Sequence, residues 1–182
     1  MPRDLVVLHE LANIGAGHAA TALSQLFSRP VGMTPPKVFE LTLAEAIEYF
    51  QPDEHEVSAA LLRLEGALAG VIALLTSDSE EMLKALGMEP GIEADVIAEC
   101  GNIVAAKVAD AIGSMTMMDS RPSTPAAGVA PYAGVIELVL QMTAQSEPFV
   151  VAFSELTIGD ALLAHLMFFP EASSVEQIEA LA

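Results

Sequence analysis

An internal repeat constrains the fold of this 182-residue chain more than any other feature of its sequence. Residues 10–14 read ELANI and recur at residues 99–103 as ECGNI, with Glu, Asn and Ile at matching places. Near the end of each half, residues 84–86 have a parallel in residues 179–181. Self-similarity of this kind predicts two similar structural units in tandem.

The hydrophobic pattern predicts the same order of elements in both halves: a long helix, an extended segment, a short helix, two strands and a closing helix. In the first half we expect a helix over 4–27 and then an extended segment over 31–41, which Pro35-Pro36 interrupts. A helix over 42–50 follows, with Thr42 and Glu45 as a capping box, and then a polar turn over 51–56. Strands over 57–64 and 69–76 come next, and a helix from Ser77 or Ser79 to about Gly87 closes the half. In the second half we expect a helix over 91–113, an extended stretch over 115–118, a Pro- and Ala-rich loop over 122–131, a helix over 132–144, strands over 149–155 and 161–169, and a last helix capped by Ser173 or Ser174.

These elements predict an α+β fold built from internally duplicated αβαββ units with pseudo-two-fold symmetry. The two units, about 4–88 and 91–182, would share one central antiparallel or mixed sheet, with the two long helices on one side of it. At 53% hydrophobic and 18% charged residues, the chain can form a sizeable core, and we expect residues 1–182 to make one domain.

The charge balance narrows the classes of partner. The net charge is −18, from 25 acidic and 7 basic residues, which disfavours binding to nucleic acid or to an anionic membrane and favours a basic protein partner. One cysteine, no apolar stretch long enough for a membrane span and no secretory signal at the N-terminus predict a cytoplasmic protein. The sequence shows no cluster of metal ligands, so we expect no cofactor of its own.

The repeated Glu and Asn residues are the candidate functional residues. Glu99 and Asn102 are three positions apart, so on a helix they share a face, which Asp95 extends. Glu10 and Asn13 form the same pair in the first half, where Val6 stands in place of Asp95. One Glu-x-x-Asn pair would ordinarily be a solvated helix face, but its recurrence in both halves favours a function, although a shared role in capping or packing would also explain it.

A proline follows each Asn at the same distance: Pro36 after Asn13, and Pro125 after Asn102. By itself each proline is best explained as shaping the strand that follows the helix. The full pattern, [Asp/Ser]-x3-Glu-x2-Asn-x22-Pro, resembles the signature of the CheC, CheX and FliY chemotaxis phosphatases. The second copy matches it fully, and the first departs at Val6. Residues 13–23 also look like the first helix of CheC, in which Asn stands where His18 is found. Two copies of the motif favour CheC over CheX.

The resemblance implies a phosphatase that hydrolyses the aspartyl phosphate of a CheY-like response regulator, which carries its own Mg²⁺. Asn102 and Asn13 would position the attacking water, and Glu99 and Glu10 would dock on the receiver. The missing acid at Val6 leads us to expect the second site to be the stronger one. The resemblance also suggests a CheD-type deamidase as a possible partner, for which the sequence shows no separate motif.

Other interpretations remain open from the sequence. The chain could be a non-catalytic receiver- or CheD-binding module, or a scaffold like that of the flagellar switch. His9 and Glu10 nearly complete the H-E-x-x-H zinc motif, but Asn13 replaces the second His. Residues 15–20 resemble a dinucleotide fingerprint inside a predicted helix, where small residues serve close packing instead. Cys100 is expected in the core, and His165 is expected to be structural.

Overall fold

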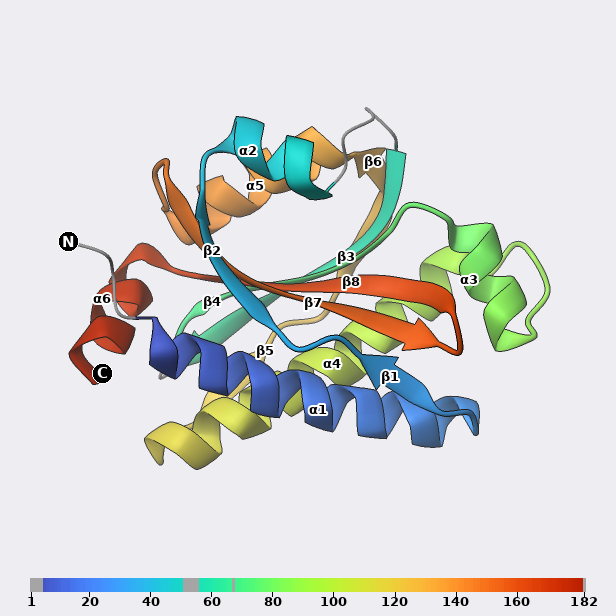
Figure 1. Ribbon diagram of the computed structural model, residues 1–182, viewed down its shortest axis with the longest axis horizontal. Coiled ribbons are helices and arrows are strands. Elements are labelled where there is room, and N and C mark those ends of the chain that lie inside the picture. Colours follow the sequence, from blue (N-terminus) through green and yellow to red (C-terminus); the bar gives the residue numbers. More distant parts are fainter. Residues whose placement is uncertain (1–4, 51–55, 67, 182) are drawn as a thin grey trace.

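The computed structural model, which describes residues 5–50, 56–66 and 68–181, is an eight-stranded antiparallel sheet with helices on both faces (Figure 1). The elements follow the chain in the order α1 (Val6–Phe27), β1 (Val31–Met33), β2 (Lys37–Leu41), α2 (Leu43–Phe50), β3 (Glu56–Gly66), β4 (Gly70–Thr76), α3 (Ser79–Leu86), α4 (Glu93–Thr116), β5 (Ser120–Pro122), β6 (Ala126–Pro131), α5 (Tyr132–Thr143), β7 (Phe149–Ile158), β8 (Ala161–Pro170) and α6 (Ala172–Leu181). This confirms the α+β class and the duplicated order of elements, whereas the boundaries of the two repeats stay a prediction.

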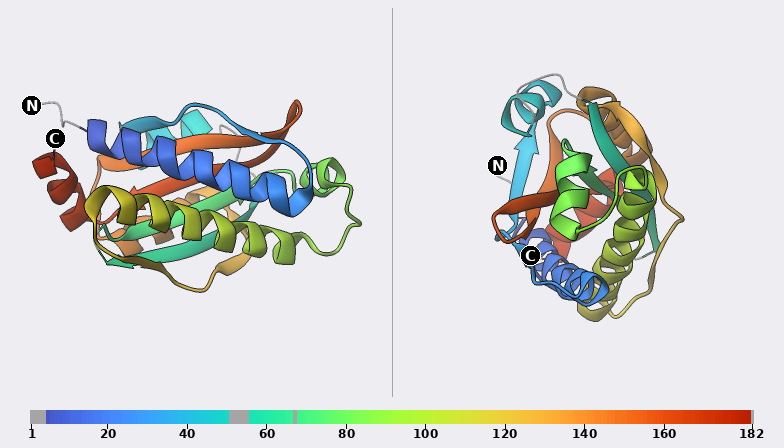
Figure 2. Two further views of the ribbon diagram at one scale, coloured as in Figure 1. Left: turned by 90° about the horizontal axis from the view of Figure 1, so that it is seen from below. Right: turned by 90° about the vertical axis from the view of Figure 1, so that its right-hand side faces the viewer.

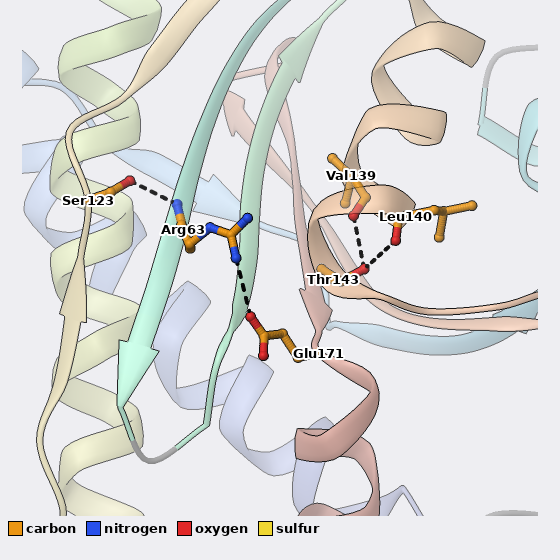
Figure 3. A network of polar contacts seen from close by, with 6 residues as sticks. All are labelled: Arg63, Ser123, Val139, Leu140, Thr143 and Glu171. Carbon is orange, nitrogen blue, oxygen red and sulfur yellow. Dashed lines mark hydrogen bonds and ion pairs between the residues drawn. The ribbon is translucent and has the colours of Figure 1, made fainter.

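The two halves exchange strands within the sheet. The strand order is β1-β7-β8-β4-β3-β5, with β2 also paired to β7 and β6 also paired to β3. The first two strands of each half therefore pair with the other half, while β4 and β8 meet at the centre. Matching hydrogen bonds mark the symmetry: Glu155 N donates to Thr34 Oγ1 at 2.9 Å in one half, and Arg63 N donates to Ser123 Oγ at 3.0 Å in the other (Figure 3).

The sheet separates two apolar layers (Figures 1 and 2). On one face, α1 and α4 pack side by side over the sheet, with α3 and α6 completing the layer. On the other face, the short helices α2 and α5 cover a second cluster that is rich in aromatic rings. The two long helices thus lie on one side, as the sequence predicts. None of the helices in the described part of the chain is both long and apolar enough to cross a lipid bilayer.

Small residues allow α1 and α4 to approach closely. Gly15 is buried, and a Cβ added there would lie 3.2 Å from Val108 Cγ2 and 3.4 Å from Val108 Cα. The two helices run antiparallel, as Figure 2 shows. The glycine-rich run after Asn13 is therefore a helix-packing surface in the middle of a helix, which confirms that it is not a dinucleotide loop.

Several expected boundaries were wrong. The stretch 122–131, expected to be a loop, contains the whole edge strand β6 and the last residue of β5, because strand β3 supplies their backbone hydrogen bonds even though Pro, Ala and Gly are poor strand formers. Helix α4 continues through Thr116 and ends at Met117 in the left-handed conformation, so 115–118 is not an extended stretch. By contrast, helix α3 begins at Ser79, one of the two residues expected, and Asp78 caps it by accepting a hydrogen bond from Glu81 N at 2.8 Å.

Of the remaining local expectations, one was confirmed, one was wrong, and one falls mostly outside the described residues. Thr42 N and Oγ1 both donate to Glu45 Oε2, at 2.8 and 2.9 Å, which confirms the capping box before α2. Helix α6 begins at Ala172, so neither Ser173 nor Ser174 stands at its N-cap. Most of the turn expected over 51–56 lies outside the described residues, and Glu56 begins β3.

Candidate functional site

The candidate stripe of α4 faces away from the core. Asp95, Glu99 and Asn102 are all exposed. The opposite arc of the helix is buried, as the sequence predicts, and consists of Val96, Ile97, Cys100, Val104 and Val108. Because the apolar arc is fixed in the core, the rotation of α4 about its axis is fixed as well. The polar stripe is therefore held on the outer surface of the molecule.

The first helix presents its pair in the same way. Glu10 and Asn13 are exposed, while Leu8 and Leu11 are almost completely buried beneath them. Val6, the residue at the position of Asp95, is 69% exposed, so the first copy has an apolar side chain in solvent where the second has a carboxylate. The two pairs are thus alike in their placement and unlike in their flanking residue.

Asp95 also has a structural explanation. It lies in the first turn of α4 with Glu93, where the partial positive charge of the helix N-terminus stabilises carboxylates. Glu93 accepts a hydrogen bond from Gly91 N at 3.0 Å, which lowers the pKa of this carboxyl. The first turn of α1 has no acidic residue. A carboxylate at position 95 therefore stabilises helix α4 whether or not it also contacts a partner protein.

The antiparallel packing of the helices separates the two pairs. With Gly15 level with Val108 and a rise of ~1.5 Å per residue, the pairs lie roughly 16 Å apart along the helix axes. Each pair sits in the N-terminal half of its own helix, toward opposite ends of the layer (Figure 2). The structure therefore brings Glu and Asn together within each pair, and it does not bring the two pairs together.

The four side chains have no internal partner. None of Glu10, Asn13, Glu99 and Asn102 makes a side-chain hydrogen bond or ion pair with another described residue. This excludes the capping explanation for the pairs. An exposed carboxylate that accepts and an amide that both donates and accepts are free to contact a partner molecule.

The prolines of the motif shape the sheet edges. Pro36 is buried and immediately precedes β2, and Pro125 is half-buried and immediately precedes β6. Proline lacks an N–H and cannot donate to a neighbouring strand. Pro36 therefore lies at the break between β1 and β2 along β7, and Pro125 lies at the break between β5 and β6 along β3. This matches the structural explanation of both prolines.

The competing motifs lack the required surroundings. The described residues contain no group of three His, Cys, Asp or Glu that could hold a metal ion, and His9 lies exposed on α1. Burial raises the pKa of the Cys100 thiol to about 12, with a further contribution from the Glu99 charge, which is the behaviour of a core cysteine. The sequence gave no indication of a cavity on the opposite face of the sheet.

Known proteins that are similar to this chain in sequence or in fold include chemotaxis proteins and flagellar switch proteins. A model of the CheC-like family matches residues 7–40, which hold Glu10, Asn13 and Pro36. The chain is 26% identical over 188 residues to the CheY-P phosphatase CheC of Bacillus subtilis, covering 94% of this chain and 90% of that protein.

Solved structures share the fold across nearly the whole chain. FliY of Thermotoga maritima superposes with a TM-score of 0.72 at 16% identity, covering 99% of this chain and 96% of FliY. The FliM middle domain of Vibrio alginolyticus superposes with a TM-score of 0.65 at 12% identity, covering 97% and 99%. Sequence and fold together confirm the resemblance to the CheC, CheX and FliY group.

Proposed function

We propose that the protein accelerates hydrolysis of the aspartyl phosphate on a CheY-like receiver, using Asn102 and Asn13 at two separate sites. The observation that carries the proposal is that the Glu-x-x-Asn pair occurs twice, each time on the outward face of a long helix and without a side-chain partner among the described residues. The similarity to the CheY-P phosphatase of Bacillus subtilis supports the same activity.

The chemistry suits an amide. Phosphoryl transfer depends mainly on positioning and on stabilising charge, so a group that orients the attacking water can be sufficient. The Asn amide can accept from the water and donate to a phosphoryl oxygen without changing its own charge. The receiver would supply the Mg²⁺ as part of the substrate. Glu99 and Glu10 would contact a basic residue of the receiver and set the register of docking.

The two sites should differ in strength. Asp95 adds a carboxylate to the second pair, where the first has Val6. If that carboxylate supports docking on a basic surface, the second site turns over faster. We therefore assign the larger share of the activity to Asn102.

The test follows the decay of a phosphorylated receiver. Each CheY-type receiver encoded in the same genome is phosphorylated, and its dephosphorylation is timed with and without the protein in the presence of Mg²⁺. Asn102→Ala should remove most of the acceleration, because a water misplaced by about 1 Å costs about 10²-fold in rate. The double variant with Asn13→Ala should remove the remainder. Gln25→Ala on the exposed surface of α1 is the matched control and should behave as wild type.

A second candidate function is binding without catalysis, because the FliM middle domain has a similar fold, and the same assay tests it. The protein could bind a receiver, or a CheD-type deamidase, without turnover. Binding of the phosphorylated receiver with unchanged decay would favour this alternative and reject the phosphatase. Unchanged decay acceleration in Asn102→Ala would instead reject the assignment of the second site.

A further inference from the structure

A cavity of about 500 Å³ lies on the face of the sheet opposite α1 and α4. Its walls come from the β1–β2 connection, the end of α2, β7 and β8, around β2 in Figure 1. Phe50 and Phe153 form its apolar side, with ring centroids 4.7 Å apart, and Tyr49 packs at 4.9 Å from Phe50. Its size is within the range of small-molecule sites.

The cavity contains one basic and one acidic side chain that do not neutralise each other. Lys37 Nζ donates to Tyr49 Oη at 3.3 Å. Glu155 Oε1 lies 3.9 Å from His165 Nε2, and burial lowers the pKa of His165, which favours the neutral ring. Within the described residues the structure records no ion pair between Lys37 and Glu155. Both charges are therefore available to a ligand.

The duplicated fold supplies an internal control for this cavity. The register of β2 on β7 and of β6 on β3 shows which residues are equivalent in the two halves. The equivalent positions carry none of the aromatic or acidic groups, the pairs being Lys37 with Ala126, Tyr49 with Leu138, Phe50 with Val139, Phe153 with Leu61, Glu155 with Arg63, and His165 with Val71.

The side chains at the six equivalent positions are compatible with the same fold. At the equivalent place Arg63 is tied to Glu171 by an ion pair of 3.4 Å, as Figure 3 shows, so its charge has a structural partner. Within the described part of the chain, the one basic side chain recorded beside Glu155 is His165, whose ring favours the neutral form. The fold therefore accepts Ala, Leu, Val and Arg at the equivalent positions, so its topology does not require an aromatic and charged set around this cavity, although Phe50 and Phe153 also pack in the aromatic core cluster.

The charges select the ligand. An anion alone would lie beside Glu155, and a cation alone would lie beside Lys37, whereas a small zwitterion satisfies both. Lys37 lies opposite Phe153 in the β2–β7 register, and Glu155 is two residues further along β7, a diagonal of about 7–8 Å on one face. We propose that the cavity binds a free α-amino acid with an apolar or aromatic side chain, its carboxylate on Lys37, its ammonium on Glu155 and its side chain against the rings of Phe50 and Phe153. This site is separate from the phosphatase sites and does not depend on them.

The test compares three probes of one shape: L-phenylalanine, phenethylamine, which lacks the carboxylate, and 3-phenylpropanoate, which lacks the ammonium. Binding is followed by chemical-shift titration of the ¹⁵N-labelled protein, which detects weak binding and also locates it. L-phenylalanine should bind at least about tenfold more tightly than either partial analogue, because each lost charge contact is worth about one factor of ten or more. The shifts should be confined to residues of α2, β2, β7 and β8.

Variants of Lys37 and Glu155 test which charged group of the ligand each side chain contacts. Lys37→Met and Glu155→Gln, after their thermal unfolding is shown to match wild type, should each weaken L-phenylalanine binding about tenfold. Glu155→Gln should in addition reduce the preference over 3-phenylpropanoate. Glu137→Gln on α5 removes one exposed acid that does not line the cavity and should change nothing. The proposal is rejected if L-phenylalanine gives no saturable shifts, if the three probes bind equally, or if the shifts map to another surface.

Discussion

Replacement of Gly15 by alanine tests whether close contact between α1 and α4 holds the layer that carries both candidate sites. In a helix interior, Gly→Ala by itself stabilises by about 0.8–1 kcal/mol. At Gly15 the new Cβ would lie 3.2 Å from Val108 Cγ2 and 3.4 Å from Val108 Cα, inside the usual contact distance of about 3.5–4.0 Å. Overpacking of this kind costs about 1–3 kcal/mol, so the net effect is a loss of up to about 2 kcal/mol.

Gly17, two residues away in the same helix, is the matched control. Its added Cβ would meet only Met33 Sδ at 3.9 Å, an ordinary contact, so Gly17→Ala should gain the full propensity. The two variants should therefore differ by about 1–3 kcal/mol in the free energy of unfolding. With a urea slope of about 2 kcal/mol/M, their midpoints should differ by roughly 0.5–1.5 M. Equal midpoints at unchanged slope would refute the packing argument, as would a Gly15→Ala penalty that is undiminished when Val108 is also changed to Ala, which removes Cγ2.

Three further predictions use other parts of the structure. Val6→Asp in the Asn102→Ala background should raise the remaining receiver dephosphorylation if the flanking acid supports docking, and no change would remove the reason for ranking the sites. Cys100, whose pKa burial raises to about 12, should react slowly with thiol reagents at about pH 8 in the native protein and rapidly in urea; fast native labelling would contradict its place in the core. Burial lowers the pKa of His165, with Glu155 opposing in part, so its contribution to stability is complete above the unfolded pKa of about 6.5 and is lost as pH falls through the folded pKa. Between about pH 7.5 and 5.5 the urea midpoint should therefore fall further in wild type than in His165→Gln, and identical changes would argue against it.

The repeat predicted the architecture because duplication restricts how a sheet can be assembled. The repeat of residues 10–14 at 99–103, together with the matching order of elements in both halves, predicted two long helices on one side of a shared sheet, and the 3.6-residue period placed Cys100 inside and Glu99 outside. These features depend on local periodicity, which a sequence displays directly.

What the sequence did not display depends on contacts between distant segments. Strand β6 reads as a loop because Ala, Gly and Pro have low strand propensity, and only its pairing with β3 makes it a strand. The cavity was missed for the same reason: Lys37 is far from Glu155 and His165 in the chain, and β2–β7–β8 pairing brings the three together.

The exchange of strands between the halves also fixes an order of events during synthesis. Once β5 and β6 emerge, their partner β3 is already available, since Ser120 pairs back to Gly66. Strand β1 must wait, because Val31 pairs with Ile158 near the other end of the chain. Contacts of such long sequence separation form late and slowly. Strands β1 and β2 are made before β7 but can pair in the sheet only after it, and until β7 is complete the apolar underside of α1 depends on α4 and other partners for cover.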